Sequence, residues 1–290
     1  MSPPQRIDAH VHVFPEDVAA DRSRHLVMDP AFREMYADPG AAIISAGEIL
    51  PAMDSAGITR SIVCGFGWAS GDLCRANNDA IIESVARHPG RITGFGTIAP
   101  DESLTDALTE IDRIAAAGLR GLGELRPDTQ GLFDLDTDAE GALADRIRSH
   151  GMGLLLHASE PLGRAYPGKG EATPERLYGL LQRLTTIPTI LAHAGGGLPF
   201  YAHLRGVGDV LADVYVDTAA MPYLYAPAAV RTLINAIGSE RILFATDYPL
   251  MPQERVIRYL DEAGLSTEEM ERVMFRNAGD FLRRVRAVQA

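Results

Sequence analysis

The sequence contains eight short apolar runs, rich in β-branched residues, that recur at fairly even intervals. Each is followed by a polar or helix-like connection, and several connections carry hydrophobic residues at helical spacing. The runs are residues 6–14, 61–66, 92–98, 121–125, 153–157, 188–193, 214–217 and 242–247, and the clearest helical stretches are 106–118, 139–150, 174–184, 227–237 and 253–263. Apolar strands that alternate with helices predict a parallel sheet covered on its outer face. We therefore expect residues 1–290 to form one domain, a single (β/α)₈ barrel of the TIM type.

A doubly wound open sheet is the alternative fold. It usually has fewer strands, and no Gly-x-Gly-x-x-Gly fingerprint follows the first run. Residues 14–47 are too long and polar for a tight connection, so we expect an excursion over the barrel mouth that acts as a lid or an interface. Residues 267–288 are expected to form two helices with the segment 277–279 between them.

The composition, 46% hydrophobic and 23% charged residues, is that of a globular protein with a sizeable core. The formal net charge of −12 argues against a nucleic-acid partner, which usually requires a basic surface. No stretch approaches the roughly 18 apolar residues that span a bilayer, and the first run begins too early to leave room for a signal peptide. Cys64 and Cys74 are expected to be free thiols, and the expected location is the cytoplasm.

His10 and His12 lie one residue apart at the end of the first run. In a strand, the side chains of residues i and i+2 project from the same face, about 6–7 Å apart along the strand. Two imidazoles in this arrangement can bind one divalent ion. A half-buried strand can also carry two solvated histidines, so the interpretation depends on the other polar residues.

The active sites of such barrels lie at the carboxyl ends of the strands. The polar residues at those ends are His10, His12, Glu124, Arg126, His157, His193 and Asp247. Three neutral imidazoles and a carboxylate suit Zn²⁺ first, and would also hold Mn²⁺, Fe²⁺ or Co²⁺. A catalytic ion lowers the pKa of bound water to near 7, and a neighbouring carboxylate can take its proton. The structural alternatives are a hydrogen-bonded core histidine at position 157 and a helix-capping residue at position 247.

This set of motifs resembles the amidohydrolase superfamily. The resemblance is carried by the His-x-His pair, His157, His193 within Ala-His-Ala-Gly-Gly, and Asp247 within Ala-Thr-Asp-Tyr-Pro, and it runs from Ile7 to about Leu282. It is closest to the amidohydrolase-related branch, which also holds aminocarboxymuconate-semialdehyde decarboxylase and aromatic-acid decarboxylases. As a set the motifs are specific, although each alone is not.

The resemblance implies four metal ligands, His10, His12, His157 and Asp247. It also implies that His193 acts as an acid or base or polarises the substrate, and that Asp247 activates water in hydrolytic members. The fourth strand departs from the common pattern, because Glu124 stands there and no lysine does. Some relatives use a glutamate at this place to bridge two ions, and the alternative for Glu124 is an ion pair with Arg126. One ion is favoured, and two remain an option.

Four residues are predicted to contact the substrate. Arg126 follows Glu124 on the same face, higher in the mouth, where its guanidinium could bind a carboxylate. The loop of residues 159–170 is rich in glycine and proline and brings Arg164 and Tyr166 over the mouth. Trp68, the only tryptophan, follows the second run and could form a wall of the pocket. A solvated position on the rim is the alternative for the charged residues.

Three functions remain open. The first is a metal-dependent hydrolase of a small amide, lactone or ester that uses metal-activated water. The second is a metal-dependent, non-oxidative decarboxylase of a small unsaturated or aromatic acid, with a proton delivered by Asp247 or His193. The chain is rather short for such decarboxylases, which favours hydrolysis. The third is a non-catalytic metal-binding protein. The expected partner is a small molecule, and the excursion could also form a homodimer interface.

Overall fold

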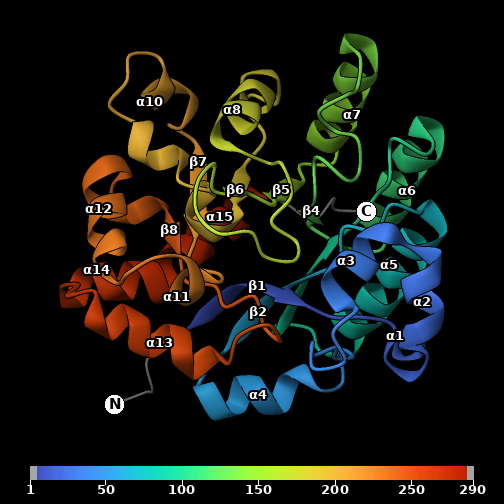
Figure 1. Cartoon of the computed structure of the whole chain (residues 1–290), viewed down its shortest axis with the longest axis horizontal. Coiled ribbons are helices and arrows are strands. Elements are labelled where there is room, and N and C mark those ends of the chain that lie inside the picture. Colours follow the sequence, from blue (N-terminus) through green and yellow to red (C-terminus); the bar gives the residue numbers. More distant parts are fainter. Residues whose placement is uncertain (1–4, 286–290) are drawn as a thin grey trace.

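The computed structural model describes residues 5–285 and contains eight parallel strands, in which each strand pairs with the next along the chain (Figure 1). The strands are β1 Ile7–His12, β2 Arg60–Cys64, β3 Ile92–Gly96, β4 Gly121–Leu125, β5 Gly153–Leu156, β6 Thr189–Leu191, β7 Val214–Asp217 and β8 Ile242–Leu243. All eight coincide with predicted runs. The last strand is shorter than expected, because the chain leaves the regular ladder after Leu243.

Backbone hydrogen bonds between β1 and the segment after β8 close the barrel. The N–H of Asp247 donates to the carbonyl of His10 at 2.9 Å, and the N–H of His12 donates to the carbonyl of Tyr248 at 2.8 Å. The predicted (β/α)₈ barrel is therefore confirmed. The same two bonds bring Asp247 beside the histidine pair, although 235 or more residues of sequence separate them.

Helices surround the strands in Figure 1. They are α1 Glu16–Ala20, α2 Arg22–Met28, α3 Pro30–Tyr36, α4 Ile49–Ala56, α5 Gly71–Arg87, α6 Leu104–Ala116, α7 Thr137–Ser149, α8 Pro174–Arg183, α9 Ala192–Gly195, α10 Val207–Val210, α11 Met221–Leu224, α12 Ala228–Ile237, α13 Gln253–Glu262, α14 Thr267–Glu271 and α15 Asn277–Arg284. The five helical stretches predicted most clearly correspond to α6, α7, α8, α12 and α13. Side-chain hydrogen bonds cap the N-termini of several helices. The hydroxyl of Ser103 caps α6, and Ser266 with Glu269 forms a capping box at α14.

An irregularity in β1 turns the histidine pair into the barrel. The register of β1 on β2 shifts between Asp8 and Val11. Before the shift, Ile7 packs with the apolar residues that fill the barrel, whereas Val11 packs with the helices outside it. An extra residue in a strand reverses which face the following residues occupy. This bulge therefore lets apolar residues fill the floor of the barrel and histidines occupy the layer above it.

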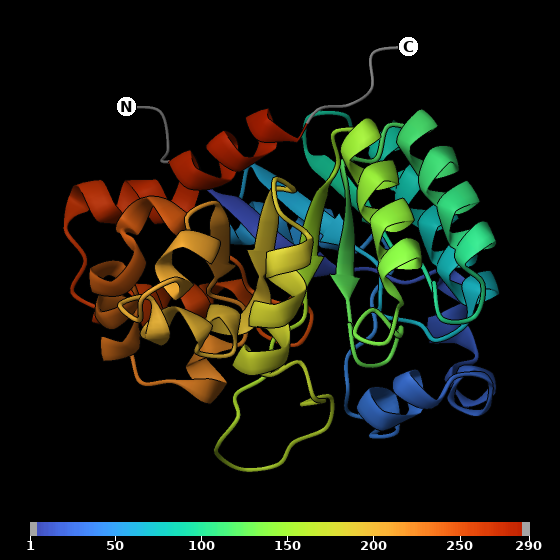
Figure 2. The ribbon, with the colours of Figure 1, turned by 90° about the horizontal axis from the view of Figure 1, so that it is seen from above.

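Helix α15 covers the end of the barrel opposite the mouth (Figure 2). Phe281 of this helix packs with Phe95 and Leu155 in the apolar cluster that fills the barrel. The predicted break at residues 277–279 is wrong, because Asn277 begins α15 and its amide donates to the carbonyl of Ile242 at 2.8 Å. Residues 286–288 of that prediction lie outside the described part of the chain.

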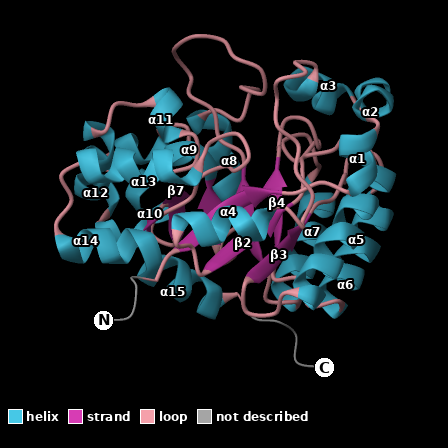
Figure 3. Cartoon of the chain, turned by 90° about the horizontal axis from the view of Figure 1, so that it is seen from below, coloured by secondary structure: helices cyan, strands magenta, loops and turns pink. Residues whose placement is uncertain are grey.

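The excursion forms α1, α2 and α3 at the mouth of the barrel, on the same side as the loop of residues 157–173 between β5 and α8 (Figures 2 and 3). We call this loop the β5–α8 loop. The carboxylate of Glu34 in α3 accepts the N–H of Gly168 at 3.0 Å and so joins the excursion to the loop. Among the described residues, no helix is long and apolar enough to cross a membrane.

Candidate active site

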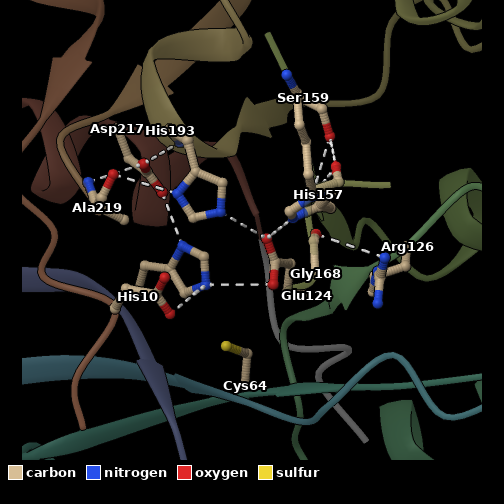
Figure 4. A network of polar contacts seen from close by, with 12 residues as sticks. His10, Cys64, Glu124, Arg126, His157, Ser159, Gly168, His193, Asp217 and Ala219 are labelled. Carbon is tan, nitrogen blue, oxygen red and sulfur yellow. Dashed lines mark hydrogen bonds and ion pairs between the residues drawn. The ribbon is translucent and has the colours of Figure 1, made fainter. Parts of the chain in front are cut away.

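Six polar residues predicted from the strand ends come together in the mouth of the barrel. They are His10 and His12 of β1, Glu124 of β4, His157 after β5, His193 after β6 and Asp247 after β8. Each of them is at most 7% exposed. Figure 4 shows Glu124 between the ring of His10 on one side and the rings of His157 and His193 on the other.

One side of this site brings together two imidazoles and two carboxylates. The Nε2 atoms of His10 and His12 lie 3.0 Å apart, and Oδ1 of Asp247 lies 3.2 Å from the second of them and 3.8 Å from the first. Oε2 of Glu124 lies 3.7 Å from Nε2 of His10 and 3.4 Å from that of His12. Ligands that each lie about 2.1 Å from one ion are roughly 3–3.5 Å apart, so the distances from the two Nε2 atoms to these oxygens lie at, or a few tenths of an ångström beyond, the spacing of donors that share one cation.

The other side of the site is built around the second oxygen of Glu124. Oε1 lies 3.1 Å from Nδ1 of His157 and 3.4 Å from Nε2 of His193. These three donor atoms lie within 4.8 Å of one another. The structure therefore places His157 with His193 and Glu124, and not in the group that contains His10 and His12.

Hydrogen bonds to the outer nitrogen of each ring fix which nitrogen faces the centre. Nδ1–H of His12 donates to the carbonyl of Gly65 and that of His193 to the carbonyl of Ala219, each at 3.1 Å. Nε2–H of His157 donates to the carbonyl of Lys169 at 3.2 Å. In the neutral ring the other nitrogen then keeps its lone pair. The rings of His12, His157 and His193 therefore each present an acceptor nitrogen to the centre. The ring of His10 does so as well, because of the contact described next.

Asp217 at the end of β7 is a site residue that the sequence analysis missed. Its Oδ2 accepts Nδ1–H of His10 at 2.9 Å, and its Oδ1 accepts the N–H groups of His193 and Ala219 at 2.8 and 3.1 Å. A carboxylate in this position orients a metal-binding histidine and raises its basicity. Its place at the carboxyl end of a predicted strand was the available signal.

Cys64 of β2 also lies beneath the histidine pair. Its thiol donates to the carbonyl of Val11 at 3.2 Å and lies 3.7 Å from Nδ1 of His12. Burial raises the pKa of this thiol, but the charges of His12 and His10 lower it by a larger amount. The pKa therefore falls from the usual 9.0 to about 7. Both cysteines are free in the described structure, as predicted.

The charges of the site are strongly coupled. Burial alone would raise the pKa of Asp247 and of Glu124, but the facing imidazoles lower that of Asp247 to about 2 and that of Glu124 well below its usual range. Burial would lower the pKa of His193, and the hydrogen bond and charge of Glu124 raise it to about 9. Buried carboxylates and imidazole lone pairs at this spacing fit a divalent cation.

Two of the site residues adopt the left-handed backbone conformation, His193 with φ 56° and Asp247 with φ 62°. This conformation is costly for residues other than glycine and occurs preferentially at functional sites. The hydrogen bond from the N–H of His193 to Asp217 stabilises this conformation at His193. The carboxylate that orients His10 therefore also stabilises the strained backbone of His193.

The residues predicted to contact substrate fall in different environments. Arg126 is 2% exposed, and its Nε and Nη1 have no hydrogen-bond partner within residues 5–285. Its closest carboxylate is Glu34, at 3.6 Å. Arg164 is exposed on the β5–α8 loop, where the hydroxyl of Tyr166 donates to Glu160 at 2.8 Å.

Trp68 lies in an aromatic cluster under the excursion. Its ring stacks on Phe32 with centroids 5.0 Å apart, and its Nε1–H donates to Asn77 at 2.9 Å. It is 1% exposed. Tyr36 of α3 packs on the same Phe32 ring at 4.7 Å. Trp68 therefore packs inside this aromatic cluster and supports the excursion through Phe32.

The sequence of this chain is similar to those of several known proteins. The chain matches the amidohydrolase family model over residues 7–284. The curated decarboxylase orsB of Emericella nidulans is 25% identical to it, over 81% of this chain and 84% of that protein. The 2-amino-3-carboxymuconate-6-semialdehyde decarboxylase of Dictyostelium discoideum is 24% identical, over 73% of this chain and 66% of that protein.

Solved structures share the fold. The 5-carboxyvanillate decarboxylase of Sphingomonas paucimobilis has a TM-score of 0.76 and 22% identity, over 97% of this chain and 99% of that chain. A dihydroxybenzoic acid decarboxylase of a Polaromonas species, with bound manganese and the inhibitor 2-nitroresorcinol, has a TM-score of 0.72 and 19% identity, over 98% of both chains.

These relatives correct the expected reaction. Hydrolysis, expected first from the sequence, is wrong as the main reading, because the curated relatives and the solved structures of known activity are decarboxylases. The decarboxylase alternative is the one they favour, and the resemblance to the branch that holds aminocarboxymuconate-semialdehyde decarboxylase is confirmed. The family model extends over nearly all described residues, from β1 to the last residue of α15. The chain belongs to the amidohydrolase family.

Proposed function

We propose that the protein is a divalent-metal-dependent, non-oxidative decarboxylase of a small aromatic or unsaturated acid. The observation that carries the proposal is that curated relatives matched over most of this chain are decarboxylases. The buried set of imidazoles and carboxylates at the strand ends supports it, because that set could hold both a cation and a proton beside one substrate.

His10, His12, Asp247 and Oε2 of Glu124 would hold the cation, which when bound holds and polarises acidic oxygens of the substrate. In the reaction the bond between the substrate carbon and its carboxylate breaks, and CO₂ leaves. The electron pair stays on the carbon, which takes up one proton. The protein's own residues must therefore orient the acid, exclude water and supply that proton.

His193 is the proposed proton donor. Its raised pKa of about 9 lets Nε2 hold a proton at neutral pH, whereas the carboxylate of Asp247, with a pKa near 2, stays ionised. Positioned proton transfer contributes about 10²–10⁴-fold to a rate. The carbonyl of Ala219 and the carboxylate of Asp217 keep the ring and backbone of His193 in place for this role.

Arg126 is the proposed anchor for a second anionic group of the substrate. A buried guanidinium with two donor atoms that lack hydrogen-bond partners among the described residues favours an anion that reaches it. Arg164 and Tyr166 stay predictions as further contacts from the β5–α8 loop, and Trp68 stays a prediction as part of the wall. A cytoplasmic location, a homodimer and a one-domain chain likewise stay predictions.

The identity of the ion is a separate question. Zinc was expected first from the ligand set, and manganese is bound in a solved relative. Both ions accept imidazole and carboxylate ligands. We propose one catalytic ion per chain and expect Mn²⁺ and Zn²⁺ to be distinguished by turnover after reconstitution of the metal-free protein.

The experiment that tests the function compares CO₂ release with hydrolysis on the same enzyme. Reconstituted protein is incubated with a panel of aromatic and unsaturated acids, and separately with esters, lactones and amides. We expect CO₂ from an acid, and in D₂O one deuterium on the carbon that lost the carboxylate. His193→Asn should lower kcat by about 10²-fold or more without loss of the ion. Hydrolysis without CO₂ release would contradict the proposal. Metal binding with no turnover on either panel would favour a non-catalytic protein.

A further inference from the structure

We propose that Glu34 of α3 is a specificity-determining residue, because its carboxylate lies at the position beside Arg126 that an anionic group of the substrate would take. The inference rests on the proposed function, in which Arg126 anchors a second anionic group. Glu34 belongs to the excursion and Arg126 follows β4, so two segments far apart in the chain meet at this position.

The guanidinium of Arg126 is surrounded by acceptors that do not use all of its donors. Oε2 of Glu34 lies 3.6 Å from Nη1, and Oδ2 of Asp128 lies 3.9 Å from Nη2. The carbonyl of Gly168 accepts Nη2–H at 3.5 Å (Figure 4). Nε and Nη1 have no hydrogen-bond partner within residues 5–285. The two carboxylates therefore balance the charge of Arg126, and an anionic oxygen at about 2.7–2.9 Å would gain the charge-assisted hydrogen bond that Glu34 does not make.

The carboxylate of Glu34 also contacts the β5–α8 loop. Its Oε1 accepts the N–H of Gly168 at 3.0 Å. Gly168 has φ 81°, and a Cβ at this position would lie 3.0 Å from side-chain atoms of Met35 in α3, so a glycine lets the loop approach the helix closely. One acidic group thus faces a guanidinium and a backbone N–H together. A substrate carboxylate or phenolate would meet the same pair of donors there.

The two members of this ion pair differ in exposure, which decides which of them can move. The side chain of Glu34 is 47% exposed, whereas that of Arg126 is 2% exposed. Two carboxylates beside one guanidinium repel each other, so an anionic group that reaches Arg126 displaces Glu34 toward solvent. Because ion pairs with an exposed partner are weak, this competition should reduce the affinity for such an acid by about 2–5-fold.

The competition separates two classes of acid. An acid with a second anionic group must displace Glu34 to reach Arg126. An acid whose only carboxylate is held by the metal-binding residues leaves the contact of Glu34 in place. The charge of Glu34 therefore lowers the affinity for the first class and does not change the affinity for the second.

The test is the binding of two probes to the Mn²⁺-reconstituted protein, measured by isothermal titration calorimetry. Isophthalate carries two carboxylates, and benzoate carries one. Glu34→Gln keeps an acceptor for the N–H of Gly168 but removes the charge, so the Kd of isophthalate should fall about 2–5-fold and that of benzoate should stay the same. Glu171→Gln is the matched control, because Glu171 is exposed on the same loop and pairs with Arg176. It should leave both Kd values unchanged.

Arg126→Ala provides the second arm of the test. In that background Glu34→Gln should no longer change the Kd of isophthalate, because the group for which the two carboxylates compete has been removed. The fluorescence emission of Trp68, whose ring stacks on Phe32 of α3, should be the same in Glu34→Gln and wild type. That result shows that the helix keeps its packing.

Four results would each overturn the inference: an unchanged Kd of isophthalate in Glu34→Gln, an equal change for benzoate, a change that persists with Arg126→Ala, or no binding of isophthalate at millimolar concentration. CO₂ release from the panel of acids separates the inference from the proposed function. CO₂ release with an unchanged Kd of isophthalate overturns only the role of Glu34. Tighter binding of isophthalate to Glu34→Gln without CO₂ from any acid overturns only the proposed reaction.

Discussion

Oδ2 of Asp217 accepts Nδ1–H of His10 at 2.9 Å, and both side chains are fully buried. The other oxygen of the same carboxylate holds the backbone of His193. One residue at the end of β7 therefore orients a proposed metal ligand and a proposed proton donor together. This contact explains why β7 belongs to the site although it supplies no donor to the centre.

Replacing Asp217 by Asn should weaken metal binding by about 10–100-fold, because the ring of His10 loses the partner that fixes its orientation and basicity. Competition with a chelating dye measures the affinity. Asp213→Asn is the matched control, because Asp213 is exposed at the start of the same strand region and pairs with Arg284. An affinity unchanged in Asp217→Asn, with normal folding by circular dichroism, would contradict the role.

Asp8 provides a pH-dependent part of the stability. It is fully buried and accepts hydrogen bonds from the N–H and hydroxyl of Thr246 and from the amide of Gln253. Burial raises its pKa from 3.8 to about 6. The folded protein therefore holds this proton more tightly than the unfolded chain does, and the contribution is full below about pH 4 and is lost as the pH rises through 6.

Asp8→Asn removes this titration. The difference in unfolding free energy between wild type and variant should decrease by about 2.4 kcal/mol between pH 4 and pH 7, because the pKa is 3.8 in the unfolded chain and about 6 in the folded protein. Urea unfolding of the metal-free proteins at several pH values measures it. A difference that stays constant over this range would show that Asp8 keeps an ordinary pKa.

Arg126→Ala should raise KM for the acid more than it lowers kcat. Loss of a charged hydrogen bond costs about 1.5–3 kcal/mol, which corresponds to roughly 10–150-fold in KM. Arg126→Lys should recover part of the loss, because it keeps the charge without the planar fork. Arg91→Ala, at the other end of the barrel, is the control. Equal KM values for Arg126→Ala and wild type would exclude Arg126 as the anchor.

Removal of the metal should lower stability as well as activity. A ligand present at 100 times its Kd stabilises the folded state by about 2.7 kcal/mol, so the melting temperature should fall after chelation and recover with added Mn²⁺. Acid should have the same effect, because imidazole donors must be neutral to bind and the pKa values of His10 and His12 are raised well above the usual 6.5, so metal affinity should fall steadily as the pH decreases from neutral. Melting curves with and without chelator over this range check it. Curves that coincide would argue against a metal in the folded protein.

The strand ends of the candidate site were accessible to sequence reasoning because barrels put their chemistry at one end. His10, His12, Glu124, His193 and Asp247 could be grouped without a structure, since each lies at or near the carboxyl end of an apolar run. Asp217 obeys the same rule and was missed because its run carries no recognised motif. The grouping of His157 with Glu124 and His193 could not be predicted, because it depends on the rotation of each strand about the barrel.

The type of reaction also could not be predicted from the site residues. Hydrolysis and decarboxylation can share the same ligands, so the residues alone did not separate them, and the length of the chain pointed in the wrong direction. Comparison with decarboxylases over most of the chain made the correction.

The sequence by itself determined the barrel and the identity of most site residues, because hydrophobic periodicity and residue type are local properties. The tertiary structure decided three further features: the bulge that turns His10 inward, the packing of Phe281 under the barrel, and the two faces of the Glu124 carboxylate. Each of these depends on contacts between segments far apart in the chain, whose distances and angles are set by packing of the whole barrel and not by any local pattern.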